Sequence, residues 1–395
     1  MSGNAGGGYG DVRASIDVAS LNRYLATHVP AVQPPVAIKQ FKFGQSNPTY
    51  LLTDACRQRF VLRKKPAGAL LSKTAHQIER EYTVLHALHT HNCRPSTTPD
   101  QRVPVPEPFV LCRDVSVIGT PFYIMEFLDG RLFTDPTMPS LSPKDRRQCW
   151  LSAVRSLAAL SSLSPSAIGL DSYGPHTPYF PRQIKSLSKI SAAQASAVDV
   201  DTKEPVGNIP RFHEMITWYS NHLPDENKTG LRVVHGDYKL DNLMFHPTEN
   251  RVIGILDWEL STLGSPLVDF ANLTQPWLID SKRMAEENPS VRSMPNVFVG
   301  FRGSANPEPI SVEELEREYC HITKYTYPIR EMTFVRSWML FRLSIIAQGI
   351  AARHARRQAS SAMAESYGEL FPVIGDLAIG VLEESIGNLN EKSKL

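Results

Sequence analysis

Two stretches of this chain join short apolar runs to polar clusters: VVHGDYKLDNLMF at residues 233–245 and VIGILDWE at residues 252–259. The apolar runs have the composition of short buried strands, and the polar residues follow where those strands end. Rigid strands position the loops that follow them, and such loops often carry catalytic residues. We therefore expect Asp237, Asn242 and Asp257 to converge on one point.

Two carboxylates and a carboxamide suit phosphoryl transfer. This reaction needs an oriented hydroxyl, metal ions that bridge the phosphates, and cations that spread the charge. A carboxylate beside the hydroxyl accepts its proton, which is the role we assign to Asp237. Hard oxygen ligands hold magnesium, which is the role we assign to Asn242 and Asp257. The residues thus suit phosphoryl transfer assisted by Mg²⁺.

The Asp-x-x-x-x-Asn spacing, with a second Asp between apolar and aromatic neighbours, resembles the protein-kinase catalytic loop and its metal-binding Asp. His-Gly-Asp at 235–237 and Leu-Asp-Trp-Glu at 256–259 look like the aminoglycoside phosphotransferase and choline-kinase branch. The resemblance implies an α+β, protein-kinase-like bilobal fold, with a five-stranded antiparallel N-lobe, one N-lobe helix and a mostly α-helical C-lobe. It also implies a small-molecule kinase.

Four further segments resemble the kinase-like domain that is fused to acyl-CoA dehydrogenases in some eukaryotic proteins. They are FGQSNPTY at 43–50, FVLRKKP at 60–66, HQIEREY at 76–82 and DWELST at 257–262. The similarity covers about residues 36–275, and we expect the kinase-like unit to stand alone here. It suggests the hydroxyl of a hydroxyacyl-CoA as the phosphate acceptor, by association only.

The resemblance also implies where the nucleotide binds. Backbone N–H groups of one turn are expected to cover the ATP phosphates, from Gly44, Gln45, Ser46 and Asn47. Arg63 stands where protein kinases use Lys; we expect it to hold the α and β phosphates and to pair with Glu81, with Lys64 as the alternative cation. The adenine site is expected at Glu126, Phe127 and Leu128.

Three more residues are expected to support the site without reacting: His235, Lys239 and Asp269. A histidine next to a catalytic Asp could also be a general base. In this motif, however, its usual role is to hydrogen-bond the loop backbone, which we favour for His235. Asp269 occupies the position of a buried Asp that braces the catalytic loop in the family.

Sequence patterns predict two parts of different structure. Strands are expected over 36–43, 49–53, 59–63, 108–114 and 121–127, and helices over 17–29 and 75–88. We therefore place an N-lobe at 16–128, after a disordered glycine-rich tail at 1–15. The C-lobe is placed at 129–390, with helices over 143–162, 209–222, 311–324 and 333–360, followed by a targeting tail at 391–395.

Residues 164–205 stand apart from this helical pattern. They are rich in Ser, Pro and Ala and show little periodicity. Such a composition predicts a mobile insertion or a substrate loop.

The charge balance excludes some functions. The net charge is +2, from 42 basic and 40 acidic residues, so no global field favours nucleic acid. The longest apolar stretch, at 338–352, is interrupted by Arg342 and is too short to cross a bilayer. Five scattered cysteines form no close pairs, which fits a reducing compartment and excludes a zinc motif.

The chain ends in Ser393, Lys394 and Leu395. This tripeptide at a free C-terminus is read by the peroxisomal import receptor, so we expect a peroxisomal protein, and otherwise a cytoplasmic one.

Two other functions stay open at this point. The acceptor could be an aminoglycoside, choline or a sugar, for which an amine-binding pocket would be acidic and a CoA-binding pocket basic. The chain could also be a non-catalytic scaffold that binds nucleotide without turnover.

Overall fold

The computed structural model describes residues 8–10, 12, 16–41, 47–66, 77–228, 230–292, 298–304, 307–358 and 364–392. The chain forms two compact units. The first comprises Met1–Thr134, Gln148–Gly174 and His235–Thr262, and the second comprises Asp135–Arg147, Pro175–Val234 and Leu263–Leu395. Both quoted motifs, from His235 onward, thus belong to the unit that contains the N-terminal sheet. The predicted lobe boundary after residue 128 stays a prediction.

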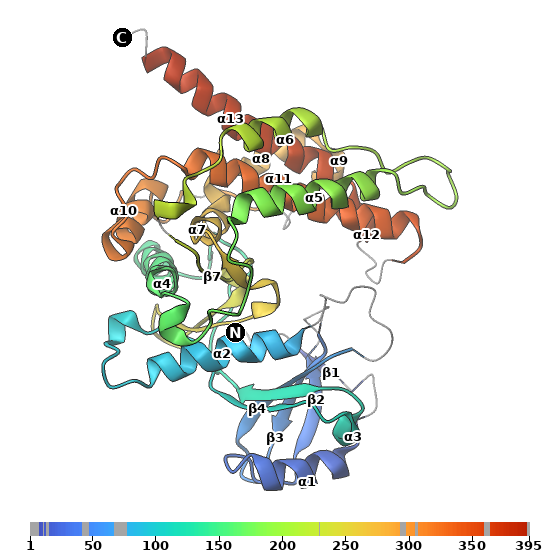
Figure 1. Ribbon diagram of the computed structural model, residues 1–395, viewed down its shortest axis with the longest axis vertical. Helices are drawn as coiled ribbons and strands as arrows, with labels where there is room; N and C mark the ends of the chain where they lie inside the picture. Colours follow the sequence, from blue (N-terminus) through green and yellow to red (C-terminus); the bar gives the residue numbers. More distant parts are fainter. Residues whose placement is uncertain are drawn as a thin grey trace. The chain divides into compact units, whose positions relative to one another are not determined.

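The first unit contains a six-stranded antiparallel sheet among its described residues (Figure 1). Its order is β1-β2-β3-β4-β6-β5. The strands are β1 (Tyr9–Gly10), β2 (Ala37–Phe41), β3 (Thr49–Thr53), β4 (Arg59–Lys64), β5 (Pro108–Cys112) and β6 (Phe122–Glu126). The predicted five strands are therefore too few, because Tyr9 and Gly10, expected in a disordered tail, pair with Phe41 and Gln40. The Tyr9 ring also contacts the Phe41 ring edge-on, with centroids 5.1 Å apart.

Helices α1 (Val18–His28) and α2 (Ile78–Asn92) cover opposite faces of this sheet (Figure 1). Asp17 caps α1 by accepting a hydrogen bond from Ser20 N. Leu21 and Leu25 of α1 then pack with Leu62 in an apolar core. A one-turn helix, α3 (Val115–Ile118), joins β5 to β6.

The rest of the first unit supports the motif residues. Helix α4 runs over Pro143–Ser162, as predicted, and continues from the second unit into the first. Strands β8 (Leu243–Phe245) and β9 (Val252–Ile255) form a hairpin. The first unit also contains short 3-10 turns: η1 (Pro99–Gln101), η2 (Ser166–Ile168), η4 (Leu240–Asn242) and η5 (Trp258–Leu260).

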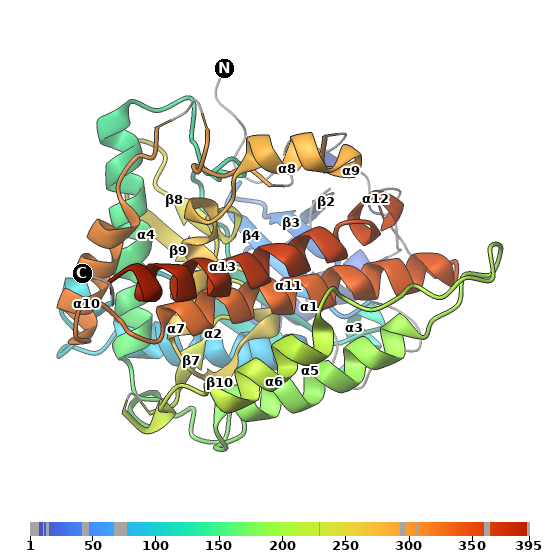
Figure 2. The same ribbon diagram turned by 90° about the horizontal axis from the view of Figure 1, so that it is seen from above.

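The second unit is mainly helical (Figure 2). Its helices are α5 (Tyr179–Ala195), α6 (Phe212–Asn221), α7 (Leu267–Leu273), α8 (Ser281–Glu287), α9 (Pro289–Arg292), α10 (Val312–Thr323), α11 (Met332–Ala355), α12 (Ala364–Gly368) and α13 (Phe371–Lys392). Two 3-10 turns accompany them, η3 (Glu226–Lys228) and η6 (Gln275–Trp277), and β7 (Arg232–Val234) pairs with β10 (Thr262–Gly264). Helix α11 is central, since α5, α7 and α13 pack against it.

The expectation of a loop over residues 164–205 is wrong at 179–195, which form the regular helix α5. Its buried residues are Tyr179, Phe180, Ile184, Ser191 and Ala195. Small residues fill the C-terminal half of that buried face, so apolar periodicity is weak in the sequence.

Some predicted features fall outside the described residues: Gly44, Gln45 and Ser46 of the phosphate turn, and Ser393, Lys394 and Leu395. Of the helices that the structure describes, none combines the length and apolar character that crossing a membrane requires.

Candidate active site

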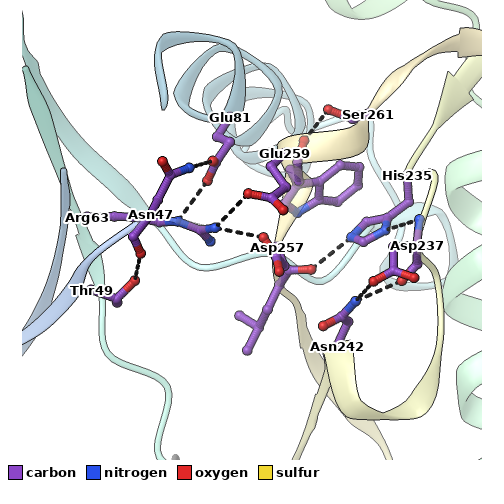
Figure 3. A network of polar contacts seen from close by, with 12 residues as sticks. Asn47, Thr49, Arg63, Glu81, His235, Asp237, Asn242, Asp257, Glu259 and Ser261 are labelled. Atoms are coloured by element: carbon purple, nitrogen blue, oxygen red, sulfur yellow. Dashed lines mark hydrogen bonds and ion pairs between the residues drawn. The ribbon is translucent and has the colours of Figure 1, made fainter. Parts of the chain in front are cut away.

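Asp237 and Asn242 are joined directly in the loop before β8. The Asn242 side-chain nitrogen donates hydrogen bonds to the Asp237 carbonyl oxygen at 2.8 Å and to Asp237 Oδ2 at 2.9 Å (Figure 3). Because the amide nitrogen is used in this way, the amide oxygen remains available as a ligand. The predicted base and the first predicted metal ligand thus lie side by side.

His235 ties this loop to the segment that carries Asp257. Its Nε2 lies 2.8 Å from the Leu256 carbonyl oxygen, and its Nδ1 lies 3.2 Å from the Asp237 backbone nitrogen. A neutral ring with the proton on Nε2 satisfies both contacts. Since the ring is buried and both nitrogens have partners, this arrangement suits a supporting role and leaves no nitrogen to accept a substrate proton.

Backbone geometry also restricts the loop. Gly236 has φ +86°, and a Cβ at this position would lie 2.6 Å from the Leu260 carbonyl oxygen. Glycine alone meets both conditions without strain. Tyr238, two residues later, donates its hydroxyl hydrogen bond to Ala153 O of α4 at 2.8 Å, which anchors the loop to a long helix.

Arg63 of β4 lies among three carboxylates (Figure 3). Its Nη2 lies 2.7 Å from Asp257 Oδ1 and 3.6 Å from Glu259 Oε2, and its Nε lies 3.3 Å from Glu81 Oε2. Burial lowers the pKa of Arg63, but Glu81 and Asp257 oppose this and hold the pKa above its usual range. Arg63 therefore stays charged and connects sheet, helix α2 and the Asp257 segment.

The structure separates Arg63 from the alternative cation, Lys64. Successive residues of a strand point to opposite faces of the sheet. Arg63 faces Glu81 of α2, whereas the Lys64 Nζ lies 5.7 Å from the centre of the Tyr50 ring. Burial lowers the pKa of Lys64. Arg63 is thus the cation that is placed with Glu81 and Asp257.

Glu81 accepts two hydrogen bonds besides its ion pair with Arg63. Asn47 Nδ2 donates to Oε1 at 2.8 Å, and the Tyr123 hydroxyl donates to Oε2 at 3.0 Å. Burial raises the pKa of Glu81 to about 7, and the charge of Arg63 opposes that rise. The Asn47 side chain is committed to Glu81, so its predicted contact with phosphate would have to come from its backbone.

Asp257 adopts an uncommon backbone conformation. Its φ is +63°, in the left-handed region that non-glycine residues rarely occupy, and it starts the turn η5. Its side chain is about a third exposed, and one oxygen accepts from Arg63. Strained residues of this kind often lie in functional sites.

Lys239 places a second cation beside the predicted base. Its Nζ lies 3.5 Å from Asp237 Oδ2 and 3.2 Å from Asp241 Oδ2. Burial lowers the pKa of Lys239, but the two carboxylates have the larger effect and the pKa is raised. Burial also raises the pKa of Asp241, which Lys239 opposes. Lys239 thus lies where it can neutralise charge next to Asp237.

Side-chain contacts hold the segment that is predicted to bind adenine, Glu126 to Leu128. Glu126 Oε2 accepts from Glu107 N at 3.2 Å, and the Arg59 guanidinium lies 4.3 Å from the centre of the Phe127 ring. Leu128 packs against Gly254 of β9, where an added Cβ would lie 2.1 Å from Leu128 Cδ1. The backbone of this segment is thereby held in place, and its contact with adenine stays a prediction.

Asp269 is buried in α7 of the second unit. Its predicted role in bracing the catalytic loop stays a prediction.

The donor set suits magnesium that is bound together with phosphate. In the part of the chain that the structure describes, no group of three or more His, Cys, Asp or Glu side chains could hold a metal ion alone. Mg²⁺ commonly takes one or two protein ligands and fills its other positions with phosphate oxygens and water. The Asn242 amide oxygen and the Asp257 carboxylate are hard oxygen donors of the required kind, so the residues fit a magnesium–nucleotide complex.

Two members of this network, Tyr123 and Glu259, are not among the site residues predicted from the sequence. Glu259 stands two residues after Asp257, so its position in the motif was a usable signal. Tyr123 lies opposite Arg63 in the register of β4 and β6. That register depends on strand pairing, which the local sequence does not reveal.

Comparison with known proteins gives the family. Residues 37–289 match the phosphotransferase enzyme family. The chain belongs to this family. Acyl-CoA dehydrogenase family member 11 of Gallus gallus is 37% identical over 375 residues, which cover 93% of this chain and 43% of that protein. The chain thus spans less than half the length of this relative.

Solved structures agree with this assignment. A Ralstonia eutropha JMP134 protein, assigned provisionally as an aminoglycoside phosphotransferase, is 34% identical, with a TM-score of 0.75 and coverage of 94% of this chain and 99% of that one. Plasmodium vivax ethanolamine kinase shares the fold, with 14% identity, a TM-score of 0.57 and coverage of 90% and 85%. The predicted kinase-like α+β fold and the prediction of a small-molecule kinase are confirmed at the level of the family.

Proposed function

We propose that this phosphotransferase moves the γ-phosphoryl group of ATP to a hydroxyl group of a small metabolite. The observation that carries the proposal is the Asp237–Asn242 pair, held by His235 next to the Asp257 segment. This arrangement places a proton acceptor beside hard oxygen ligands, which is what the reaction needs.

The proposed step transfers one phosphoryl group and one proton. The acceptor oxygen forms a bond to the γ-phosphorus while the bond to the β,γ-bridging oxygen breaks, and ADP leaves with that electron pair. The proton of the hydroxyl passes to the Asp237 carboxylate. Asn242 holds that carboxylate at 2.9 Å, which limits its rotation before the proton moves.

Asn242 and Asp257 would hold magnesium, which would supply positive charge to offset the charge of the phosphates. The chain's own cations contribute as well. Glu81 pairs with Arg63, which would contact the α and β phosphates, and Lys239 would offset charge near the acceptor. These assignments give Asp237, Asp257, Arg63, Glu81 and Lys239 roles in catalysis, binding or orientation.

The proposed acceptor is the hydroxyl of a hydroxyacyl-CoA. Its support is the 37% identity with a protein named as an acyl-CoA dehydrogenase family member, over nearly the whole of this chain. A kinase-like part in such a protein would meet CoA esters. We also propose peroxisomal targeting through Ser393, Lys394 and Leu395 and the import receptor, which would place the enzyme with fatty-acid breakdown.

A second acceptor class has support of its own. The Ralstonia eutropha protein, at 34% identity over 94% of this chain, carries a provisional aminoglycoside phosphotransferase assignment. An amino sugar or amino alcohol would bind an acidic pocket, whereas a CoA ester would bind a basic one.

The test is a measurement of ADP release by purified protein with MgATP over a panel of acceptors. The panel holds hydroxyacyl-CoAs of several chain lengths, choline, ethanolamine, sugars and aminoglycosides. Phosphorylated CoA ester, identified by mass, supports the proposed acceptor. Turnover on amines alone moves the acceptor to the second class, and ATP binding without turnover on any acceptor contradicts catalysis and favours a scaffold.

A further inference from the structure

Arg80, Tyr173 and Ser261 form a buried or half-buried cluster that has no role so far in the proposed reaction. Arg80 precedes Glu81 in the first turn of α2, Tyr173 follows η2, and Ser261 follows η5. Neighbouring residues of a helix point in different directions, so Arg80 and Glu81 reach different partners. Both lie within the first unit, as do all their partners.

Among the described residues, the Arg80 side chain donates two hydrogen bonds and contacts one ring. Its Nη1 donates to the Tyr173 carbonyl oxygen at 2.6 Å, and its Nη2 donates to the Ser261 carbonyl oxygen at 3.3 Å. Its guanidinium carbon lies 4.2 Å from the centre of the Tyr173 ring. One side chain of α2 thus contacts two separate segments through the fork geometry that only arginine offers.

The hydroxyl groups of Tyr173 and Ser261 continue this connection. The Ser261 hydroxyl donates to the Trp258 carbonyl oxygen, inside the turn that Asp257 starts (Figure 3). The Ser261 oxygen therefore accepts from the Tyr173 hydroxyl, which also lies 3.3 Å from the Arg80 carbonyl oxygen. Tyr173 is 5% exposed and Ser261 is 5% exposed, so water does not replace these bonds easily.

We propose that Arg80, Tyr173 and Ser261 are positioning residues, which together act as a latch between the first turn of α2 and the Asp257 segment. Glu81 and Arg63 already link the same two segments by charge. The latch adds a second connection, in which Arg80 donates to two carbonyl oxygens instead of pairing with a carboxylate. It sets where Asp257 stands relative to Asn242, and so the affinity for magnesium with nucleotide. This inference rests on the proposed function for its magnesium role only.

The test compares three variants with the wild-type full chain. Tyr173→Phe removes one hydroxyl from the latch, and Arg80→Lys keeps the charge but removes the fork. Tyr50→Phe is the matched control, because Tyr50 is a buried tyrosine of the same unit whose hydroxyl has no hydrogen-bond partner among the residues that the structure describes. The first readout is hydrogen–deuterium exchange without ligand, and the second is the Mg²⁺ concentration that half-saturates binding of a fluorescent ATP analogue.

In Tyr173→Phe and Arg80→Lys we expect faster exchange in residues 77–85 and 256–264 together, and a magnesium half-saturation about fivefold higher, the loss of roughly one hydrogen bond. Tyr50→Phe should match the wild type in both readouts. Faster exchange around residue 173 alone would overturn the latch, and an unchanged magnesium half-saturation would overturn its positioning role. A wild-type protein that binds no ATP analogue would overturn the proposed function instead, while the exchange data still decide whether the latch exists.

Discussion

Arg63 Nη2 lies 2.7 Å from Oδ1 of Asp257, a residue 194 positions later in the chain. The same guanidinium pairs with the buried carboxylate of Glu81, so one cation fixes strand β4, helix α2 and the predicted metal ligand. Arg63 is also the residue that would contact the ATP phosphates. Its removal should therefore affect folding stability and nucleotide binding together, whereas its neighbour Lys64 allows a separate test of charge.

We expect Arg63→Met to lower the free energy of unfolding by about 3 kcal/mol, because it leaves the Glu81 carboxylate buried without its cation. ATP affinity should fall as well. Lys64→Met removes a charge from the opposite face of the same strand and should change both quantities much less. Urea unfolding and nucleotide titration measure the two effects. Equal losses in both variants would show that the face of the strand does not matter.

The pKa of Glu81, raised by burial from 4.5 to about 7, predicts a pH-dependent stability. The folded state binds the proton of the Glu81 carboxyl more tightly than the unfolded state does. This protonation stabilises the fold fully below about pH 4.5, and the stabilisation is lost as the pH rises to 7. Glu81→Gln stays neutral at every pH. We therefore expect the free energy of unfolding of the variant, relative to that of the wild type, to rise by up to about 3 kcal/mol between pH 4.5 and 7 and to change no further above pH 7.

Unfolding free energies of both proteins over this pH range provide the measurement. If the wild type instead became more stable relative to Glu81→Gln as the pH rises, Arg63, Asn47 and Tyr123 would lower the pKa of Glu81 more than burial raises it.

Gly236 and Gly119 allow a matched test of the catalytic loop. Their φ values are +86° and +84°, so alanine costs similar backbone strain at both. A Cβ at 236 would lie 2.6 Å from the Leu260 carbonyl oxygen, whereas a Cβ at 119 meets nothing within 4 Å. We expect Gly236→Ala to lose roughly 1–3 kcal/mol more stability than Gly119→Ala and most of the turnover. Similar losses of stability and turnover in the two variants would rule out the contact with Leu260 as the constraint.

Much of this fold can be predicted from the sequence, where one local signal dominates. Helix α4 begins and ends at the predicted residues, Pro143 and Ser162. Its start has a local signal, because Ser142 accepts a hydrogen bond from Asp145 N and proline suits the first position of a helix. Helix α13 was not predicted, although Phe371, Ile374, Ala378 and Leu382 repeat at helical spacing and are buried. Its glycines and Pro372 obscure that signal.

The motif residues of the site could be predicted from the sequence, but the contacts between distant segments could not. The spacing of Asp237, Asn242 and Asp257 suffices to expect them together. The choice between Arg63 and Lys64 is different, because β4 is buried at both residues and no polar–apolar alternation marks its faces. The latch through Tyr173 has no sequence signal either, since it depends on where α2 packs against η2 and η5.

The measurement that tests the central claim most directly is turnover by Asp237→Asn, with ATP binding measured on the same protein. We expect kcat to fall by about 10²–10⁴ with the ATP dissociation constant nearly unchanged, because the amide cannot accept the proton of the acceptor hydroxyl. Asp241→Asn, which alters the other carboxylate beside Lys239, should lose less than about tenfold. Wild-type turnover in Asp237→Asn would contradict the account.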